Sequence, residues 1–379
     1  MTKIFLSAGE ASGDLHAGAI TKAILELDPT AQVFGMGGDA MRSAGGEVIF
    51  DLKEYSVMGF VEILSALPKF FALRKAFRKV MEERRPDCFV TIDYPEFNMR
   101  AAKVAKELNI PVLSFIPPSA WAWRKGRAVS VGRLVDKVAC IYPFAYDVYK
   151  AAGANAEFVG NPLVDIVKPH LSRAAAMAKA GKEQGKPLVL LLPGSRVKEI
   201  TGVLPVMLEA VGIIKEALPQ ADFVLQKAPT IDNSLLREII AQSGETVRIV
   251  EGDGYDIMSV ADVALATSGT VTLEAALCGL PVVICYMASP LSMAIAKKIV
   301  TVKYIGLPNI LANREILPEL IQEKMTSGNM AKEVLHFLHP EEYKNIREEL
   351  AKVVHKLGPG GATKRVAQLI LNLAGDDKC

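Results

Sequence analysis

Short runs of apolar residues recur along the first half of the chain, separated by longer stretches in which the apolar residues have helical spacing. The runs lie at residues 4–8, 33–36, 88–92, 112–116, 138–142 and 158–160. Runs this short are typical of buried parallel strands, and the stretches between them are long enough for crossover helices. We therefore predict that the first domain is an open parallel sheet of about six strands covered by helices.

The pattern breaks near Pro162 and starts again at Leu188. Between these points residues 167–186 are polar and rich in alanine, which is typical of a domain boundary. A second series of apolar runs follows at residues 188–192, 223–226, 247–250, 263–266 and 282–286. We therefore predict two Rossmann-like α/β domains, 1–166 and 167–345, whose parallel sheets face each other across a cleft.

One segment of the first half, residues 57–85, combines a nearly continuous apolar stretch with many lysine and arginine residues. Such a segment suits the interface of an anionic membrane, where each basic residue contributes about 1 kcal/mol to binding. It equally suits a core helix with a solvated basic face, and the pattern alone leaves both interpretations open. The residues expected to dock on a membrane are Val57, Met58, Phe60, Leu64, Leu67, Phe70, Phe71, Arg74, Lys75 and Arg78.

Composition narrows the classes of function. The 379 residues carry a net charge of +2, so the chain as a whole has no strong attraction to nucleic acid. The five cysteines form no C-x-x-C pair and no histidine lies at metal-ligand spacing. This argues against a metal site and a disulfide framework, and favours a reducing cytoplasm. The mean hydropathy of +0.24 is high for a soluble protein.

One uncharged stretch, residues 275–296, has the length of a membrane span. It contains Gly279 and Pro281, which fit a buried strand and a loop better than one continuous helix. The first residues also lack the pattern of a signal peptide, because Glu10 and Asp14 follow only a short apolar run. We therefore predict a cytoplasmic protein without a transmembrane helix.

Two strand-to-helix turns of the second domain have the composition of anion sites. One carries Gly194, Ser195 and Arg196, and the other carries Ser268, Gly269 and Thr270. Free N–H groups at the start of a helix attract phosphate, and an arginine can bind two phosphate oxygens. Glu274 lies about one turn into its helix, where it either accepts hydrogen bonds from ribose hydroxyls or complements the helix dipole. Because no Asp-x-Asp motif is present, we predict a nucleotide-sugar site that works without metal.

The first domain then has to supply a base for an acceptor. Asp93 lies at the carboxyl end of a predicted strand, where partial burial would raise its pKa toward the working range. Its alternative role is the N-cap of the next helix. His16 is a second candidate for a catalytic role, although a lone histidine in a helix is more often structural. Glu10 and Asp14 either hold acceptor hydroxyls or cap the helix that follows them.

Residues 35–40 match the dinucleotide-binding pattern G-x-G-x-x-A by letter. The match follows the second predicted strand rather than the first, and no acidic residue follows at the required spacing within a clear βαβ unit. We therefore predict no nicotinamide cofactor, and the sequence indicates no other cofactor.

A series of motifs, in order along nearly the whole chain, resembles the lipid-A-disaccharide synthase family. The motifs span residues 7–16, 35–38, 92–98, 119–123, 158–162, 192–196, 267–270 with Glu274, and 306–309. The first, Ser-Ala-Gly-Glu-Ala-Ser-Gly-Asp-Leu-His, is highly specific. Ser12 lies in this motif and Asn98 in the third, and we expect both to contact the acceptor together with Glu10 and Asp14.

The resemblance implies a glycosyltransferase of the GT-B fold that joins UDP-2,3-diacylglucosamine to 2,3-diacylglucosamine 1-phosphate. The implied products are a β-1,6-linked tetraacyl disaccharide phosphate and UDP, with inversion at the anomeric carbon. The resemblance also implies that Asp93 is the base and that Arg196 contacts the diphosphate. Glu274 and Asn309 are implied to contact the UDP moiety.

The resemblance further implies that the segment 57–85 docks on the inner leaflet of the cytoplasmic membrane and receives the acyl chains, which would account for the high hydropathy. The protein is then expected to be cytoplasmic and peripherally associated with that membrane. The C-terminal helices, residues 346–379, are expected to cross back to the first domain. The sequence leaves monomer and homodimer open.

Two other classes remain as alternatives. A UDP-N-acetylglucosamine 2-epimerase shares the two-domain scaffold but has no use for the apolar and basic segment, and it would consume one soluble substrate without an acceptor. If the chain were a non-catalytic lipid-binding protein, the apolar and basic segment would be accounted for, but Arg196 and Glu274 would have no role. Binding of UDP would argue against the second alternative.

Overall fold

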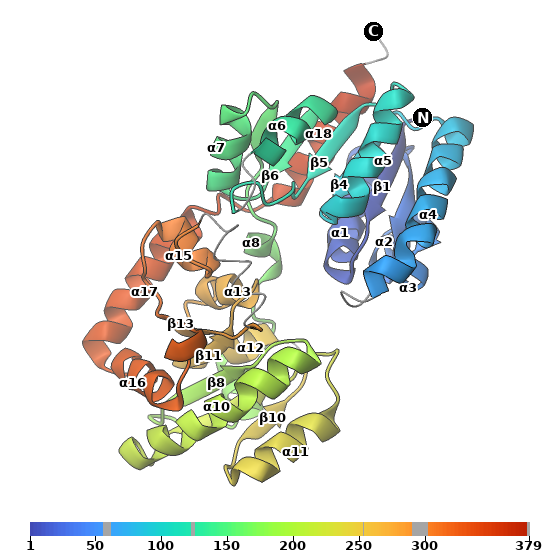
Figure 1. Ribbon diagram of the computed structural model, residues 1–379. Coiled ribbons are helices and arrows are strands. Elements are labelled where there is room, and N and C mark those ends of the chain that lie inside the picture. The colour runs from blue at the N-terminus through green and yellow to red at the C-terminus, as the bar shows by residue number, and fades with distance from the viewer. Residues whose placement is uncertain (56–61, 123–125, 253, 290–301, 377–379) are drawn as a thin grey trace. The chain divides into compact units, whose positions relative to one another are not determined.

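The computed structural model describes residues 1–55, 62–122, 126–252, 254–289 and 302–376. The chain divides into two compact units (Figure 1): unit 1 comprises Met1–Pro162 with Leu357–Cys379, and unit 2 comprises Leu163–Lys356. Each unit is built around one parallel sheet and has its own hydrophobic core. The predicted α/β class with two parallel-sheet domains is confirmed.

The sheet of unit 1 has seven parallel strands in the order β3-β2-β1-β4-β5-β6-β7, so the direction of winding reverses between β1 and β4. The apolar runs predict about six strands and do not reveal β3, an edge strand that begins and ends with an acidic residue. The strands are β1 (Lys3–Ala8), β2 (Gln32–Gly37), β3 (Glu47–Asp51), β4 (Cys88–Ile92), β5 (Val112–Phe115), β6 (Lys137–Cys140) and β7 (Ala156–Phe158).

Alternate residues of β1 supply the two cores of unit 1. Phe5 belongs to the core that contains Phe77, whereas Ile4 and Leu6 belong to the core that contains Ile370. This alternation is what a strand covered by helices on both faces requires. The helices of unit 1 are α1 (Ala11–Leu27), α2 (Asp39–Ser43), α3 (Leu52–Tyr55), α4 (Glu62–Arg84), α5 (Pro95–Glu107), α6 (Gly126–Leu134), α7 (Pro143–Ala151) and α18 (Ala362–Asp376).

The last helix, α18, packs on the sheet of unit 1, although it lies at the C-terminal end of the chain. It packs against α1, and its colour in Figure 1 marks it among the N-terminal elements. Arg365 at its start donates a hydrogen bond of 2.9 Å to the carbonyl of Val159. The preceding helix α17 (Pro340–His355) belongs to unit 2, so the chain divides at 162/163 and 356/357 rather than at the predicted 166/167 and 345/346. The glycine-rich turn at 358–361 separates the two helices.

Unit 2 repeats the strand order of unit 1. Its six parallel strands have the order β10-β9-β8-β11-β12-β13, and the winding reverses between β8 and β11. The strands are β8 (Leu188–Leu192), β9 (Asp222–Gln226), β10 (Arg248–Val250), β11 (Val263–Thr267), β12 (Val282–Tyr286) and β13 (Glu319–Ile321). Its other helices are α8 (Leu163–Ile166), α9 (Arg173–Ala180), α10 (Val197–Ala217), α11 (Asn233–Ser243), α12 (Gly254–Met258), α13 (Val271–Leu277), α15 (Leu307–Ala312) and α16 (Ser327–Phe337).

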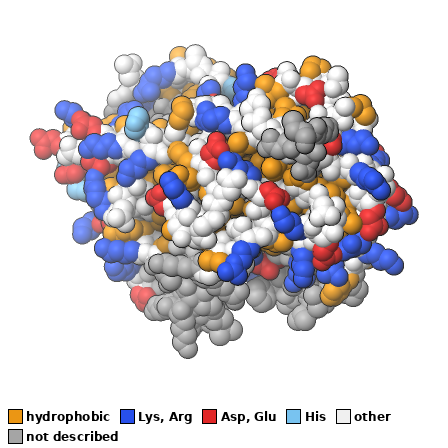
Figure 2. Space-filling view, turned by 90° about the horizontal axis from the view of Figure 1, so that it is seen from above, with side chains coloured by type: hydrophobic (Ala, Val, Ile, Leu, Met, Phe, Trp, Pro, Cys, Tyr) orange, Lys and Arg blue, Asp and Glu red, His pale blue; other side chains and the backbone are white. Residues whose placement is uncertain are grey.

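Charges of both signs are interspersed over the molecular face drawn in Figure 2. The whole sequence has 44 basic and 42 acidic residues, which fits this distribution. Among the described residues, every helix is too short or too polar to cross a membrane.

Candidate active site

Both units place candidate residues at the point where the strand order reverses. In unit 1 Glu10 follows β1 and Asp93 follows β4, and these two strands are neighbours. In unit 2 the turn 194–196 follows β8 and the turn 268–270 follows β11, which are neighbours as well. Ligands of open α/β sheets bind at the carboxyl ends of the strands at such switch points. The fold therefore brings together, within each unit, residues that are far apart in sequence.

The turn that carries Asp93 has a strained backbone. Asp93 and the following Tyr94 both have left-handed conformations, with φ of 47° and 49°. Ile116, at the end of the neighbouring strand β5, has a φ of 52°, which is rare for a β-branched residue. The N–H of Asp93 donates to the carbonyl of Phe115 at 3.1 Å, which ties the two strained turns together. Strain of this kind persists only where the surrounding structure enforces it, and it clusters at functional sites.

The surroundings of Asp93 favour its protonated form. Burial raises the pKa of this carboxyl group, and the negative charge of Glu10 raises the pKa further, while a hydrogen bond from the N–H of Tyr94 opposes both. Asp93 as a residue keeps an exposed surface, and it forms no ion pair with any residue that the structure describes. A carboxylate that is partly desolvated, open on one side and unpaired has the properties of a general base.

Tyr94 connects the two turns of unit 1. A Cβ atom built on Gly9 would lie 2.0 Å from the Tyr94 ring, so this ring packs directly on the backbone of Gly9. Only glycine fits there. Glu10 follows Gly9, and its charge raises the pKa of Tyr94 as well as that of Asp93, although burial is the larger cause for both. The contact between the two turns therefore fixes Glu10 near the candidate base.

Asn98 has a different role from the predicted contact with an acceptor. Its side chain has 0% exposure, and its amide donates to the carbonyls of Ser7 and Asp93 at 3.0 and 2.7 Å. Its oxygen accepts a hydrogen bond of 2.6 Å from the Ser7 hydroxyl. These bonds tie the end of β1 to the turn after β4. Through its hydrogen bond to the Asp93 carbonyl, Asn98 therefore helps to hold Asp93 in its strained conformation.

Asp14, Ser12 and His16 all lie on α1. The Asp14 carboxylate neither caps its own helix nor faces solvent, because it accepts hydrogen bonds from the N–H groups of Gly38, Ala40 and Met41 at the start of α2. Asp14 was predicted to hold acceptor hydroxyls or to cap α1, and in the structure its carboxylate instead binds the start of α2. Ser12 is exposed. The His16 ring stands edge-on to Phe115 at 5.8 Å, and burial lowers its pKa, so His16 is neutral at neutral pH.

The turn after β8 is closed by a carboxylate of the chain itself. The N–H groups of Ser195 and Arg196 donate to one oxygen of Glu199 at 3.1 and 3.3 Å. The Arg196 guanidinium donates to the other oxygen at 2.9 Å. Gly194 has a φ of 111°, and a Cβ there would lie 2.5 Å from the same carboxylate. The sequence predicted an anion at these groups, and Glu199, which it did not single out, is the anion that the structure shows.

The turn after β11 is more open. Gly269 and Thr270 are exposed, and the Ser268 hydroxyl donates to the carbonyl of Ile305 at 3.3 Å. The Thr267 hydroxyl, on a residue with 5% exposure, has no hydrogen-bond partner among the described residues. A buried polar group without a partner is costly and points to a ligand or a water. Glu274 is half-buried on α13.

Asn309 also differs from its predicted contact with UDP. It has 0% exposure, and its amide donates to the Leu317 carbonyl and to Glu319, each at 2.8 Å. Its oxygen accepts from the N–H groups of Ile316 and Leu317 at 2.9 Å. Glu319 in turn accepts from the N–H of Ile305, whose carbonyl receives the Ser268 hydroxyl. Asn309 therefore supports the second turn through Glu319 and Ile305.

The predicted membrane-docking segment is described in part. Val57, Met58 and Phe60 lie outside the described residues, and of Leu64, Leu67 and Phe70 only the backbone in α4 is described. Phe71 is 58% exposed, Arg74 and Lys75 are exposed, and Arg78 is half-buried. The opposite face of α4 places Leu73, Phe77 and Met81 in the core.

A groove of about 340 Å³ runs between α4 and α5, and its lining is strongly basic. Arg78 pairs with Glu107 across the groove. The other basic residues that line it make no ion pair with a described residue; they are Arg74, Lys75, Arg100 and Lys103. The groove therefore has a positive charge beside an exposed aromatic ring.

Among the residues that the structure describes, no group of three or more His, Cys, Asp and Glu side chains is placed to hold a metal ion.

The family described as "Lipid-A-disaccharide synthetase" matches residues 4–371. The chain belongs to the lipid-A-disaccharide synthase family. It is 41% identical to the lipid-A-disaccharide synthase of Geobacter sulfurreducens over 374 residues, which cover 98% of this chain and 97% of the relative. It is 39% identical to that of Syntrophus aciditrophicus, with 99% of each chain covered. This synthase is a glycosyltransferase that acts on lipid A precursors in lipid A biosynthesis.

Solved structures support the fold of the synthase. UDP-GlcNAc 2-epimerase from Neisseria meningitidis, bound to UDP-GlcNAc, is similar with a TM-score of 0.66 at 15% identity, covering 98% of this chain and all 100% of that one. A glycosyltransferase from Rickettsia africae is similar with a TM-score of 0.61 at 15% identity and 98% coverage of each chain. At this identity the likeness concerns the fold alone, which is GT-B-like. The predicted family, fold class and enzyme class are confirmed.

Proposed function

We propose that the synthase joins UDP-2,3-diacylglucosamine to 2,3-diacylglucosamine 1-phosphate, with inversion at the anomeric carbon and UDP as the second product. Unit 1 binds the acceptor and unit 2 binds the UDP-sugar. The observation that carries this proposal is the difference in chemistry between the two switch points. The one in unit 1 carries an unpaired carboxylate, and the one in unit 2 carries N–H groups, hydroxyls and an arginine.

In the proposed reaction Asp93 takes the proton of the acceptor 6-hydroxyl. The acceptor oxygen attacks the anomeric carbon from the face opposite to UDP, the new β-1,6 C–O bond forms, and the bond between that carbon and the UDP oxygen breaks with its electron pair. The raised pKa of Asp93 supports this role, since it brings the basicity of the carboxylate closer to that needed at neutral pH. His16 remains the second candidate, as its lowered pKa leaves it neutral and able to accept a proton.

The departing UDP carries negative charge that unit 2 stabilises. The Arg196 side chain is 81% exposed, so it can turn from Glu199 toward a diphosphate. The N–H groups of the turn 268–270 and the Thr267 hydroxyl supply further donors. Glu274 binds the ribose hydroxyls, and Asn309 positions the turn without touching the nucleotide. Arginine and backbone N–H groups can stabilise a diphosphate without a metal ion.

We further propose that the basic groove between α4 and α5 brings the synthase to the inner leaflet of the cytoplasmic membrane. Phe71 enters the interface while Arg74, Lys75, Arg100 and Lys103 bind anionic headgroups. The core contacts of Leu73 and Phe77 keep α4 folded while its other face binds lipid. The acyl chains of the substrates then need not leave the membrane surface.

Vesicle flotation tests this docking. The variant Arg74→Gln/Lys75→Gln/Arg100→Gln/Lys103→Gln should bind vesicles that contain anionic lipid at least about 100-fold more weakly, since each basic residue contributes about 1 kcal/mol. A control with the same loss of charge replaces exposed basic residues of unit 1 outside the groove and the segment 57–85, Lys22→Gln/Lys53→Gln/Arg133→Gln/Lys150→Gln, and should bind as the wild type does. Equal binding by the two variants would remove the groove from this role.

Product analysis tests the proposed reaction. The wild-type synthase is incubated with both acylated sugars in detergent micelles that contain EDTA, and the products are identified by mass spectrometry. We expect the disaccharide phosphate and UDP in equal amounts. Product that forms only after a divalent metal is added would contradict the metal-independent mechanism. Consumption of the UDP-sugar without the acceptor would indicate the epimerase reaction instead.

A further inference from the structure

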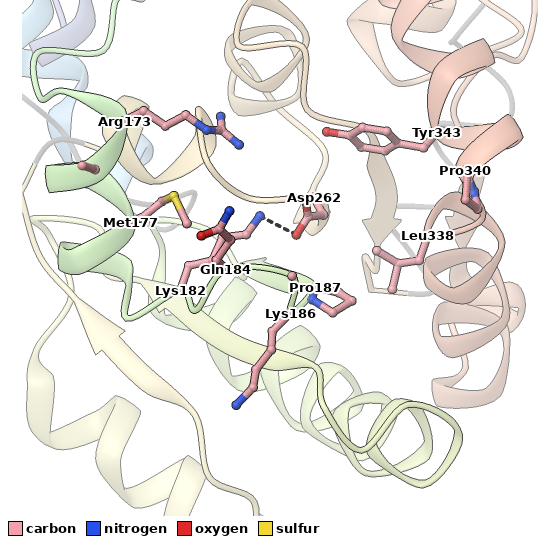
Figure 3. A pocket seen from close by; sticks show the side chains of 12 residues that line it. Arg173, Met177, Lys182, Gln184, Lys186, Pro187, Asp262, Leu338, Pro340 and Tyr343 are labelled. Atoms are coloured by element: carbon pink, nitrogen blue, oxygen red, sulfur yellow. Dashed lines mark hydrogen bonds and ion pairs between the residues drawn. The ribbon is translucent and has the colours of Figure 1, made fainter.

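Unit 2 contains a second cavity at the edge of its sheet opposite to the candidate active site. Its volume is about 750 Å³, within the range of small-molecule sites. Pro187 precedes β8 and Asp262 precedes β11, so the cavity lies at the amino-terminal ends of these strands. Figure 3 shows the side chains that line it, which come from α9, the turn before β8, the residue before β11, the end of α16 and the start of α17.

Most charges in this cavity are already compensated within the protein. The Lys182 ammonium lies 2.7 Å from a carboxylate oxygen of Asp262 and donates to the Val260 carbonyl. Lys186 pairs with Glu183 at 2.7 Å. Arg173 makes no ion pair with a described residue, so one positive charge remains for a ligand.

Two polar groups face each other across the cavity. Figure 3 shows the Arg173 guanidinium and the Tyr343 hydroxyl pointing toward one another from opposite walls. The Tyr343 oxygen accepts a hydrogen bond of 3.3 Å from Arg347, which leaves the hydroxyl hydrogen of Tyr343 for a ligand. Met177 lies on the wall of Arg173 and Leu338 on the wall of Tyr343, and the Lys182–Asp262 ion pair and Gln184 lie between the two walls (Figure 3).

We propose that this cavity binds a small monoanion, a carboxylate carried on an apolar or aromatic body. The carboxylate accepts hydrogen bonds from Arg173 and Tyr343, and the apolar body contacts Met177 and Leu338. The exposed Arg173 guanidinium, which has no ion-pair partner among the described residues, supplies the positive charge that a carboxylate requires. This site is separate from the sugar-nucleotide turns, which follow the carboxyl ends of the same strands.

NMR of the full-length protein labelled with ¹³C at the methionine methyl groups tests the proposal, with 2-naphthoate as the probe. The Met177 resonance is assigned with Met177→Leu. We expect it to shift saturably with 2-naphthoate, while the resonance of Met207, which is buried in the core, stays in place. The uncharged 2-naphthamide should bind about tenfold more weakly, the loss expected for one charge-assisted hydrogen bond.

Variants then locate the carboxylate. Arg173→Gln should weaken binding of 2-naphthoate about tenfold and Tyr343→Phe somewhat less, because the first removes a charged donor and the second a neutral one. Arg237→Gln, an exposed arginine on α11, should change nothing. A Met177 resonance that does not move at millimolar 2-naphthoate would overturn the proposal. So would equal binding of the amide and the acid by the wild type, a comparison that needs no variant to fold.

Discussion

At the switch point of unit 1 a carboxylate, Asp93, stands on a strained turn, partly desolvated and near the negative charge of Glu10. At the switch point of unit 2 a carboxylate, Glu199, accepts hydrogen bonds from two N–H groups and an arginine over a glycine turn. The strand order around the two points is the same. The two carboxylates follow different strands of their switch points, Asp93 after β4 and Glu199 after β8. Their neighbours leave the first without an ion pair and bind the second through donors of its own turn.

The two units also share a way of holding these turns. Asn98 in unit 1 and Asn309 in unit 2 are both fully buried. The amide of Asn98 donates to backbone carbonyls that include that of Asp93, and the amide of Asn309 donates to the Leu317 carbonyl and to the Glu319 carboxylate. A buried amide with all its hydrogen bonds made is a rigid support. The strain at Asp93 can persist because Asn98 binds the carbonyl of that same residue.

The substitution that should have the largest effect on turnover is Asp93→Asn, which removes the carboxylate of unit 1 from the comparison. Asparagine tolerates the left-handed backbone and cannot accept the proton, so turnover should fall about a thousandfold. Because Asp93 has a raised pKa, its charge opposes folding at neutral pH, and the melting temperature should not decrease. Single-turnover kinetics and calorimetry measure the two effects. UDP binding that is lost along with turnover would show that Asp93 does more than accept a proton.

Arg196→Ala should have the next largest effect. It removes the cation that we assign to the leaving diphosphate, and kcat/KM should fall about 100-fold, as for other groups that stabilise a developing anion. Arg237→Ala is the control, because Arg237 is an exposed arginine of the same unit outside the turns. A fall in kcat/KM no greater than in this control would place the diphosphate elsewhere.

Glu199→Gln tests the carboxylate of unit 2, because it removes the negative charge of Glu199 and keeps the size of the side chain. Glutamine can still accept the hydrogen bonds of the Ser195 and Arg196 N–H groups, but it no longer repels a diphosphate or neutralises Arg196. UDP should therefore bind a few-fold more tightly in calorimetry, on the order of 1 kcal/mol. Weaker binding would mean instead that the charge of Glu199 is needed to orient Arg196.

Glu10→Gln should have the smallest effect, and only at acid pH. Without the negative charge of Glu10 the pKa of Asp93 falls, so the base stays deprotonated to lower pH. The acid limb of kcat/KM should move to lower pH, while the rate on the alkaline side of the limb stays the same. A loss of rate at every pH would assign Glu10 a direct contact with the acceptor.

The sequence was a good guide to strands and turns and a poorer one to roles. The apolar runs located the buried strands, but β3 and β13 were missed because each begins with a glutamate and has an apolar run of only two or three residues. Family motifs included Asn98 and Asn309 without distinguishing a ligand contact from a buried support, which depends on burial. Glu199 lies three residues after Arg196, a capping-box spacing, and that pattern could have identified it.

The most direct test of the central claim, that Asp93 is the base, is the pH dependence of kcat/KM for the wild type and for Asp93→Asn. In the wild type kcat/KM should fall toward acid with a single ionisation, at an apparent pKa above the ordinary value for aspartate, because only the deprotonated form accepts the proton. The residual activity of Asp93→Asn should lack this limb. The same acid limb in both proteins, with both folded by circular dichroism, would contradict the assignment of Asp93 as the base.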